Sequence, residues 1–165
     1  MSAPDDDLVV ALRRSAHGLV QRDLGDVEDV LTQIVTSAAQ LVPGADACGL
    51  ARADRGATHV GHATDEVVRE LDRLQYDLQQ GPGVATEAGP APGSVVAARD
   101  LAGDDRNRWP RFAPRAVERG YRSVLAVPLM SENRILGVLT VWRHPVGLYP
   151  NEVVNLLQTL SLIHI

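Results

Sequence analysis

The chain has 165 residues and an apolar fraction of 45%, which predicts one folded domain with a hydrophobic core and excludes a wholly disordered chain. Its 16 Lys and Arg residues are all arginine, so chemistries that need a lysine, from a Schiff base to a phosphate-loop lysine, are excluded. The net charge of −5 argues against nonspecific binding to nucleic acid or to an anionic membrane.

Cys48 is the single cysteine, so an intrachain disulfide and a thiolate metal cluster are both excluded. The acidic opening MSAPDDDLVV lacks the basic region of a signal peptide, and the longest apolar runs fall short of a bilayer span. These features predict a cytoplasmic protein. The use of arginine without lysine is typical of a GC-rich, bacterial genome.

Two helices are expected in the first forty residues. The first lies within residues 1–22 and carries a stripe of Leu8, Leu12, Ala16 and Leu19. The second follows Asp26 as N-cap and ends at Pro43-Gly44, and its wide apolar stripe must be buried. Because the second helix can already cover a sheet, the first stripe has no evident partner within the chain. We therefore expect a homodimer formed through the first helix.

The rest of the chain alternates between short strands and helices. The expected elements are strands at 45–54 and 58–64, a helix capped by Thr64 or Asp65, a Gly/Pro-rich stretch at 79–93, a short strand around 95–96, a helix at 109–119 closed by Gly120, strands at 121–130 and 134–143 joined by a hairpin turn, and a final helix from Pro150. This order predicts an α+β fold with a central antiparallel sheet and helices over its faces.

Metal and thiol chemistry find little support in the sequence. His59 and His62 are three residues apart on an expected strand, so we expect them on opposite faces, a poor arrangement for a shared metal. Cys48 is interpreted as a small buried hydrophobe rather than a nucleophile. The arginine-rich segment RNRWPRFAPR at 106–115 is interpreted as a solvated helix start rather than a nucleic-acid patch.

The Gly/Pro stretch at 79–93 poses the main functional question. A phosphate-binding loop needs a lysine and a helix that opens directly on its glycines, and we expect neither here. A lid or wall over a ligand pocket is the preferred interpretation, because glycine lets the backbone approach a ligand and proline limits its entropy. A surface loop without a ligand is the alternative.

An ordered set of motifs resembles a GAF domain: LQYDLQQGPGVAT, then RDLAGDDRNRWPRFAPRAVERGYRSVLAVPLM, then RILGVLTVWR. The resemblance covers about residues 20–158 and is closest to the GAF half of bacterial GAF–ANTAR transcription antitermination regulators, whose C-terminal ANTAR part is absent. It implies a central antiparallel sheet with terminal helices on one face. It also implies short helices and loops that form a small-molecule pocket on the other face. Relatives often carry a cysteine where this chain has Gly83, which places thiol chemistry at that loop in doubt.

The resemblance implies a non-catalytic small-molecule or redox sensor domain of a bacterial signalling or transcription regulator. A dimerisation scaffold with no ligand is the alternative. Methionine sulfoxide reductase chemistry needs several cysteines, a bilin needs a suitable thiol, and haem would have only distant candidates in His59 and His62. The ligand stays unidentified. RNA binding would belong to a missing ANTAR domain, not to this chain.

The residues expected near the ligand are Leu78, Gly81, Trp109, Phe112 and Tyr121. Trp109 and Tyr121 are best suited to stack on a planar ligand. The alternative is that Trp109 and Phe112 only anchor their helix to the sheet.

The final six residues, LSLIHI, differ in character from everything before them. Reverse-translated as CTG-TCT-CTT-ATA-CAC-ATC, they match the transposase mosaic end used in sequencing libraries. We therefore expect an N-terminal dimerisation helix at 1–22, a GAF domain at 23–159 and a non-native, adapter-derived tail at 160–165.

Overall fold

The computed structural model describes residues 27–54, 57–89, 91–131 and 134–147. The expected first helix with its stripe of Leu8, Leu12, Ala16 and Leu19, the final helix and the tail at 160–165 lie outside the described residues. None of the helices in the described ranges has both the length and the apolar character needed to span a bilayer.

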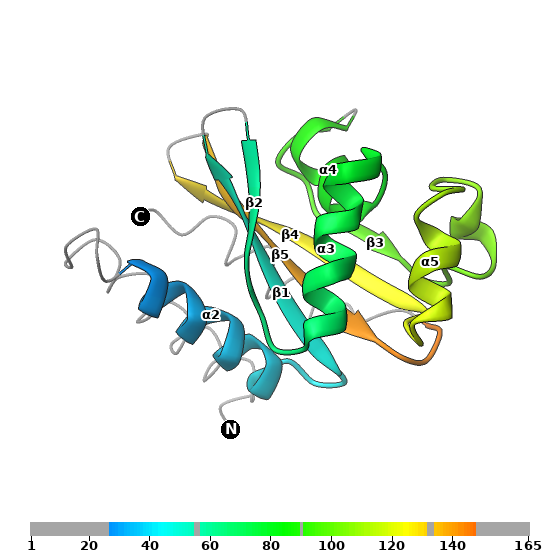
Figure 1. Ribbon diagram of the computed structural model, residues 1–165, viewed down its shortest axis with the longest axis horizontal. Helices are drawn as coiled ribbons and strands as arrows, with labels where there is room; N and C mark the ends of the chain where they lie inside the picture. Colours follow the sequence, from blue (N-terminus) through cyan, green and yellow to red (C-terminus); the bar gives the residue numbers. More distant parts are fainter. Residues whose placement is uncertain (1–26, 55–56, 90, 132–133, 148–165) are drawn as a thin grey trace, which may run out of the picture.

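A five-stranded antiparallel sheet forms the centre of the molecule, with strand order β2-β1-β5-β4-β3 (Figure 1). Its strands are β1 (Ala47–Asp54), β2 (Ala57–Ala63), β3 (Val96–Ala98), β4 (Ser123–Ser131) and β5 (Arg134–Arg143). The β4–β5 pair is the expected hairpin, since Ser131 pairs with Arg134 across the turn. The α+β fold with a central antiparallel sheet is thereby confirmed.

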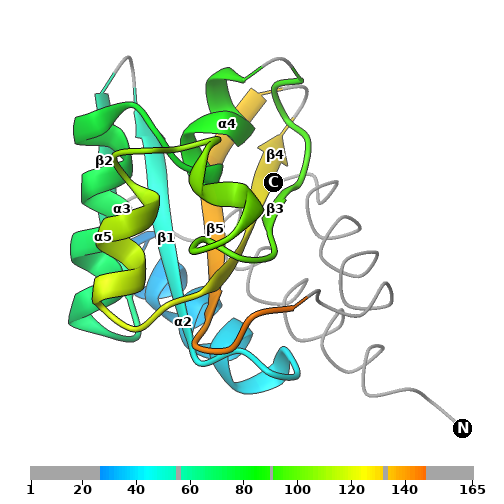
Figure 2. The ribbon, with the colours of Figure 1, turned by 90° about the vertical axis from the view of Figure 1, so that its right-hand side faces the viewer.

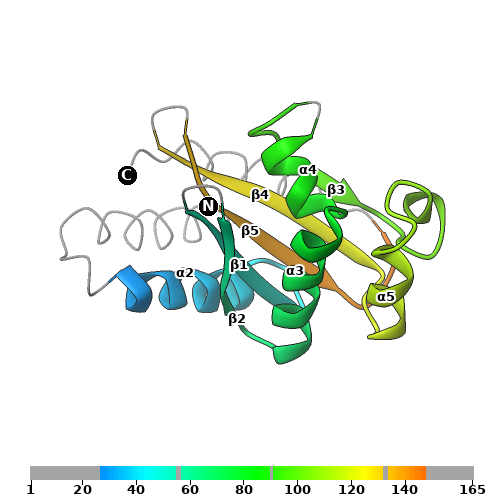
Figure 3. The same cartoon turned by 45° about the horizontal axis from the view of Figure 1, so that its top comes forward.

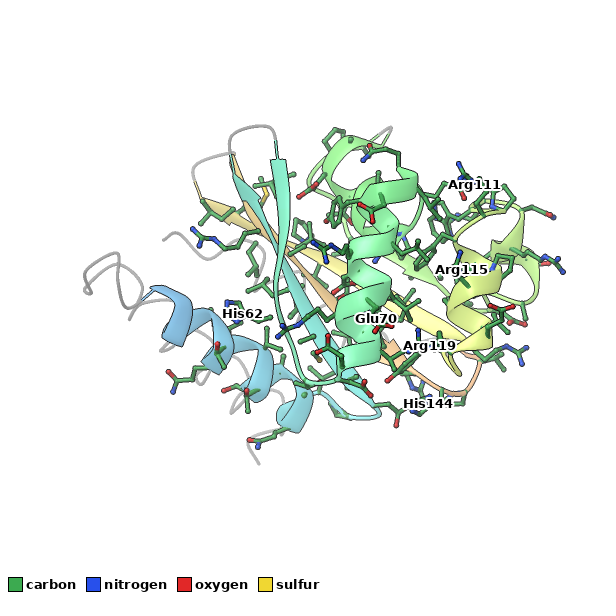
Figure 4. All side chains as sticks on the ribbon, in the orientation of Figure 1. His62, Glu70, Arg111, Arg115, Arg119 and His144 are labelled. Atoms are coloured by element: carbon green, nitrogen blue, oxygen red, sulfur yellow. The ribbon has the colours of Figure 1, made fainter. Side chains whose placement is uncertain are left out.

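Helix α2 (Val27–Leu41) covers one face of the sheet over β1 and β2 (Figure 3). Its apolar stripe is buried against alternate residues of the strands, as the helical period of the sequence requires. The resulting core consists of Ile34, Val35, Ala38, Val42, Cys48, Leu50, Leu125, Val127, Leu139 and Val141. At the outer edge, Thr32 Oγ1 lies 2.9 Å from Nδ1 of His62 on β2, which joins helix and sheet (Figure 4).

The opposite face carries α3 (Glu66–Leu78), α4 (Pro82–Ala88), the 3₁₀ turn η2 (Asp104–Arg106) and α5 (Ala113–Glu118) (Figure 2). α3 packs over β1 and β2, whereas α4 packs over β3, β4 and β5. The two helices therefore divide this face between them, with their line of contact above the middle of the sheet.

Local signals in the sequence placed several boundaries correctly. Asp65 is the N-cap of α3, and its carboxylate accepts a hydrogen bond from the Val67 amide at 2.8 Å. Gly120 follows α5 with a φ of +95°, the left-handed conformation expected for a glycine that ends a helix.

Two expectations about the segment 79–119 need correction. The Gly/Pro stretch is not wholly loop, because α4 begins at Pro82 directly after Gly81. Proline fits the first turn of a helix, where its missing N–H has no partner to lose, so the stretch opens a short helix. The expected helix at 109–119 is also shorter: regular α5 starts at Ala113, and Trp109 and Phe112 lie in the turns before it.

The strict alternation expected for β2 is broken. A register shift lies between Leu50 and Ala51, so that His59 pairs with Arg52 and His62 pairs with Leu50. Those two partners are two residues apart and lie on the same side of β1. The bulge therefore interrupts the two-residue alternation on which the expected placement of the two histidines depends.

Candidate functional site

The sheet is lined with small residues beneath the line where α3 and α4 meet. One row across the strands consists of Ala63, Gly49, Thr140, Ala126 and Val96. The neighbouring row contains Trp142 instead of Thr140 and is filled by aromatic packing. Because these side chains are small, they leave room above the middle of this face for side chains from the helices.

Helix α3 presents polar residues to this part of the sheet. Asp72 and Gln75 are completely buried, and Tyr76 is largely buried. Their spacing of i, i+3 and i+4 places the three side chains on one face of the helix. Polar residues on the buried face of an otherwise amphipathic helix are costly unless they are hydrogen-bonded, so their partners define what the site can do.

Asp72 lies at the centre of a hydrogen-bond network. The Thr140 hydroxyl is 3.0 and 3.1 Å from the two carboxyl oxygens and 3.3 Å from the Gly49 carbonyl oxygen. Gln75 Nε2 donates to Asp72 Oδ1 at 3.0 Å. Burial raises the pKa of Asp72 to about 7, although the hydrogen bonds from Thr140 and Gln75 lower it. When protonated, Asp72 can donate a hydrogen bond to the Thr140 hydroxyl, which in turn donates to the carbonyl oxygen of Gly49.

Gly49 is required at its position in this network. A Cβ on Gly49 would collide with Asp72 Oδ2 and would approach Thr140 Oγ1 to 3.0 Å. The absent side chain therefore makes room for the buried carboxyl.

Gln75 of α3 connects this helix to α4. Its Oε1 accepts a hydrogen bond from the Gly83 amide in the first turn of α4 at 2.8 Å, while its Nε2 binds Asp72. Gly81, the N-cap of α4, has a φ of +126°, and a Cβ there would collide with Gln75. The glycines of the QQGPG segment thus let the backbone approach the buried amide of Gln75.

Helix α4 contributes a second triplet of residues with the same spacing: Gly83, Thr86 and Glu87. Thr86 is completely buried, and its hydroxyl has no hydrogen-bond partner. The Tyr76 hydroxyl is likewise buried without a partner, and it would lie 3.4 Å from a Cβ on Gly83. Burial raises the pKa of Tyr76 far above its usual range, and the negative charges of Glu87 and Asp72 raise it further.

We refer to these groups as the interlayer polar cluster. It consists of Asp72, Gln75, Tyr76, Thr86, Glu87 and Thr140. The two unsatisfied hydroxyls distinguish it from an ordinary buried network, because a buried hydroxyl without a partner costs about 1–3 kcal/mol.

Most of the residues expected at the ligand site belong to an apolar cluster beside the polar one. Phe112 and Tyr121 pack edge-on against Trp142, with ring centroids 6.2 and 5.6 Å away. Trp109 is 7% exposed, in the same cluster, and Arg108 lies over its ring at 4.3 Å. Leu78 packs against the cluster from the end of α3. The structure therefore brings Leu78, Trp109, Phe112 and Tyr121 together, whereas Gly81 adjoins the polar cluster.

Tyr121 is held by partners on three sides. Its hydroxyl donates to Asp65 at 3.2 Å, and His144 stacks on its ring at 4.4 Å (Figure 4). Trp142 covers the other edge. Burial, followed by the charge of Asp65 and the hydrogen bond to it, raises the pKa of Tyr121 to about 12. This ring ties the start of β4 to the start of α3.

Cys48 points away from both clusters, into the core beneath α2. It is completely buried, and burial raises the pKa of its thiol to about 12, with a further contribution from Asp72. A thiol in this state is a poor nucleophile and a poor metal ligand. The structure agrees with the interpretation of Cys48 as a small buried hydrophobe.

The arginine-rich segment forms an exposed edge of the molecule. Arg111, Arg115 and Arg119 follow one another along the side of α5, and Arg119 forms a 2.7 Å salt bridge with Glu70 of α3 (Figure 4). Arg108 pairs with Asp105 at 2.9 Å. The exposed Arg119–Glu70 pair contributes little to stability, whereas Asp105 is buried and also accepts hydrogen bonds from the Arg99 and Asp100 amides.

Sequence reasoning missed the interlayer polar cluster. A signal was present, because Asp72 and Gln75 each stand four residues after a residue of the apolar stripe of α3, at positions where a leucine or valine would be expected. No comparable signal marks Thr86 or Thr140, because only the fold places them opposite α3.

Comparisons with known proteins agree with the fold. The family model described as GAF domain matches residues 25–162. The GAF domain of a phosphoenolpyruvate-protein phosphotransferase from Coxiella burnetii has a TM-score of 0.66 and 18% identity, covering 97% of this chain and 91% of its own. None of the curated protein sequences matches this chain.

Two further solved structures show the same fold in different contexts. Free methionine-R-sulfoxide reductase from Neisseria meningitidis, in complex with its substrate, has a TM-score of 0.63 and 16% identity, covering 99% of this chain and 89% of its own. The nlh2 GAF domain of A. aeolicus in an inactive state has a TM-score of 0.61 and 10% identity, covering 97% and 92%. At these identities the likeness shows the fold alone.

Proposed function

This chain belongs to the GAF domain family, and we propose that it is a non-catalytic sensor domain whose ligand binds at the interlayer polar cluster. GAF domains are generally sensor and signalling domains. The observation that carries the proposal is that the buried hydroxyls of Tyr76 and Thr86 have no hydrogen-bond partner, and that Tyr76 lies close enough to the buried carboxyl of Asp72 to be influenced by its charge. A ligand that hydrogen-bonds these groups would recover the free energy that their burial costs.

The position of the cluster also supports a sensor. It lies where α3 and α4 meet over the sheet, and the Gln75–Gly83 hydrogen bond links the two helices through it. A ligand that forms a hydrogen bond with Thr86 would favour one position of α4 relative to α3. Gly81 caps the start of α4 with a φ of +126°, a conformation that other residues rarely adopt, and Gly93 in the segment after the helix has a φ of +84°.

The proposal that this domain is not an enzyme rests on its thiol and its polar groups. Reductase chemistry of the kind named for the Neisseria meningitidis relative would need an accessible thiolate, and Cys48 is buried with a raised pKa. The same argument disfavours the redox form of the sensor, in which Cys48 would be oxidised. A small-molecule sensor is therefore the form of the proposal that we retain.

The wider setting that we propose follows the resemblance of the motifs to GAF–ANTAR proteins. In it, the domain acts in the bacterial cytoplasm as a homodimer within a transcription regulator. Any RNA binding would reside in an ANTAR domain, and this chain would supply the sensing half. The dimer would form through the helix expected at residues 1–22.

A binding screen against two proteins tests the function. The wild-type chain and a Thr86→Val variant would be melted in the presence of amines, alcohols, carboxylic acids, amino acids, nucleotides and haem. A true ligand raises the melting temperature of the wild type in proportion to its concentration, and the effect is smaller in the variant. If no compound stabilises the wild type, the domain is a dimerisation scaffold rather than a sensor. That alternative is favoured by the complete burial of Phe112 and Trp142 in aromatic packing.

A further inference from the structure

Arg111, Arg115 and Arg119 form an exposed row along α5 and the turn before it, which we call the arginine row. We infer that this row is an interaction surface, on which Arg111 and Arg115 bind two carboxylates of an acidic segment in a partner protein. The inference goes beyond the proposed function, which assigns a ligand site and no partner surface. Its test needs no ligand, so either proposal can fail without the other.

The three arginines lie along one side of a helical segment. They are spaced by four residues, and Figure 4 shows them following one another beside α3. The Ala113 amide donates to the Trp109 carbonyl oxygen at 2.8 Å, so the helical path begins before regular α5 and includes Arg111. Successive arginines of the row are therefore about 6 Å apart along the helix axis.

Only one arginine of the row has an ionic partner. Arg119 donates to Glu70 of α3 at 2.7 Å. Among the residues that the structure describes, the guanidinium groups of Arg111 and Arg115 find neither a hydrogen-bond acceptor nor an ion-pair partner. Like charges four residues apart on a helix repel each other. An anion bound to both arginines would remove this repulsion.

The sequence of α3 explains why Arg111 and Arg115 have no carboxylate opposite them. Glu70, Leu74 and Leu78 repeat every four residues, and both leucines pack against the apolar cluster. The two helices run in opposite directions, since Glu70 contacts Arg119 at one end. At the other end Gln80, just beyond α3, accepts a hydrogen bond from the Arg111 amide at 2.8 Å. Leucines therefore occupy the positions at which carboxylates would pair with the other two arginines.

The backbone of the row is held in place before any partner binds. Gln80 Oε1 accepts hydrogen bonds from the amides of both Arg111 and Phe112, at 2.8 and 3.2 Å. Phe112 is completely buried, which fixes the same turn from below. A surface whose backbone is already ordered loses less entropy on binding than a loop would.

Carboxylates match this surface better than a nucleic acid does. A guanidinium binds a carboxylate through two parallel hydrogen bonds. Carboxylates four residues apart on a helix, or two apart on a strand, are about 6 to 7 Å apart, which is the spacing of the row. Asp77 and Glu118 are exposed next to Leu78 and Arg119, and the chain carries a net charge of −5. A long run of phosphates would be repelled by these charges, whereas a short acidic segment fits between them.

The experiment titrates the whole chain with three defined probes: blocked hexaglutamate, blocked hexaglutamine and the oligonucleotide hexathymidylate. Nuclear magnetic resonance follows the arginine Nε–H signals at low salt, about 50 mM, and again at about 500 mM. The test variant is the double change Arg111→Gln and Arg115→Gln. The control is the double change Arg69→Gln and Arg73→Gln, which removes the same charge from exposed positions of α3 outside the row. Circular dichroism checks that each variant is folded.

Hexaglutamate is expected to bind the wild type at low salt, and hexaglutamine is not. The affinity for hexaglutamate falls at least fivefold in the test variant, changes less than twofold in the control, and falls as salt is raised. Glu70→Gln frees Arg119 for the peptide and is expected to raise the affinity at least twofold. Asp77→Asn removes the same charge without freeing an arginine, so it is expected to raise the affinity less.

Absence of hexaglutamate binding at low salt overturns the inference, and so does an equal loss of affinity in the two double variants. Tighter binding of hexathymidylate that depends on Arg111 and Arg115 would assign the row to nucleic acid and overturn the acidic partner. An equal effect of Glu70→Gln and Asp77→Asn would show that the peptide responds to net charge rather than to the row.

Discussion

Asp72 shows how one residue can combine structural and functional roles. It is completely buried, yet every hydrogen bond that it makes comes from a neutral group. Such a site tolerates the protonated acid better than the carboxylate. Asp72 is therefore the residue from which we expect a pH dependence of stability.

The first prediction concerns the pH dependence of stability. The folded-state pKa of Asp72 is about 7, above the value of about 3.9 in an unfolded chain, so the folded state binds the extra proton between these values. The stability that this proton contributes is fully present below about pH 4 and is lost as pH rises through 7. The loss is on the order of 4 kcal/mol. Urea unfolding of wild type and Asp72→Asn from pH 4.5 to 8 measures it.

The difference in unfolding free energy between wild type and Asp72→Asn is expected to favour the wild type more at low pH than at high pH. Asp77→Asn serves as the control, because Asp77 is exposed on the same helix. A difference that does not change with pH would show that Asp72 titrates normally.

The second prediction compares two tyrosines. The Tyr76 hydroxyl is buried without a partner, whereas the Tyr121 hydroxyl donates to Asp65. Tyr76→Phe is therefore expected to stabilise the free protein by about 1 kcal/mol or more, because it removes an unsatisfied polar group. Tyr121→Phe is expected to destabilise it by about 1 kcal/mol. Chemical unfolding of both variants without ligand measures the contrast, and a loss of stability in Tyr76→Phe would contradict it.

At the scale of elements, the site depends on close contact between α3, α4 and β1. Gly49 allows Asp72 to reach the sheet, and Gly81 allows the start of α4 to reach Gln75. The first contact lets Asp72 reach the Thr140 hydroxyl at 3.0 Å, and the second lets Gln75 accept a hydrogen bond from the Gly83 amide at 2.8 Å. Both glycines therefore act by leaving room for a neighbouring buried side chain.

The third prediction tests the approach of α3 to β1. Gly49→Ala places a Cβ against the Asp72 carboxyl, so α3 must shift, and overpacking of this kind costs about 1–3 kcal/mol. Gly61→Ala is the matched control on β2, because its Cβ would meet no atom closer than 3.7 Å. Urea midpoints compare the two variants. Equal stability would mean that Asp72 moves aside without cost.

The whole molecule consists of a sheet between two unlike layers. The face under α2 is wholly apolar in its core, while the face under α3, α4 and α5 combines an aromatic end with the interlayer polar cluster. In our proposal, the apolar layer under α2 provides packing and the layer of α3, α4 and α5 provides recognition. Coupling to a partner would pass from the recognition layer through the sheet to α2.

The fourth prediction concerns assembly through the expected helix at residues 1–22. Leu12→Glu is expected to convert a homodimer to a monomer, because it places a charge in the apolar stripe of Leu8, Leu12, Ala16 and Leu19. Arg14→Glu, two residues away and off the stripe, is expected to leave the dimer intact. Light scattering with circular dichroism as the folding control measures both. A monomeric wild type would contradict the prediction.

The sequence by itself determined the fold class, the β4–β5 hairpin, the end of α2 before Pro43 and the start of α3 after Asp65. Three signals depend only on residues that are close together in the chain: the two-residue alternation of AVPL and LGVLTVW, the Asp65 cap and the left-handed Gly120. Such signals can be identified from the sequence alone. The sequence also predicted that the Gly/Pro stretch at 79–93 forms a lid or pocket wall over a ligand, and that stays a prediction. The sequence did not predict α4. Residues 81–90 contain three glycines and two prolines, which conceal the signal of a helix as short as Pro82–Ala88.

Only the tertiary structure decided which residues form the site. Asp72, Thr86 and Thr140 come from three elements, and nothing local in the chain relates them. Their meeting depends on strand order β2-β1-β5-β4-β3 and on how α3 and α4 divide one face of the sheet. The same packing placed Trp109 and Phe112 in an apolar cluster, because large rings fill space wherever the fold leaves it. The polar residues of the site are buried because the helices pack on the sheet, so their burial follows from the tertiary structure.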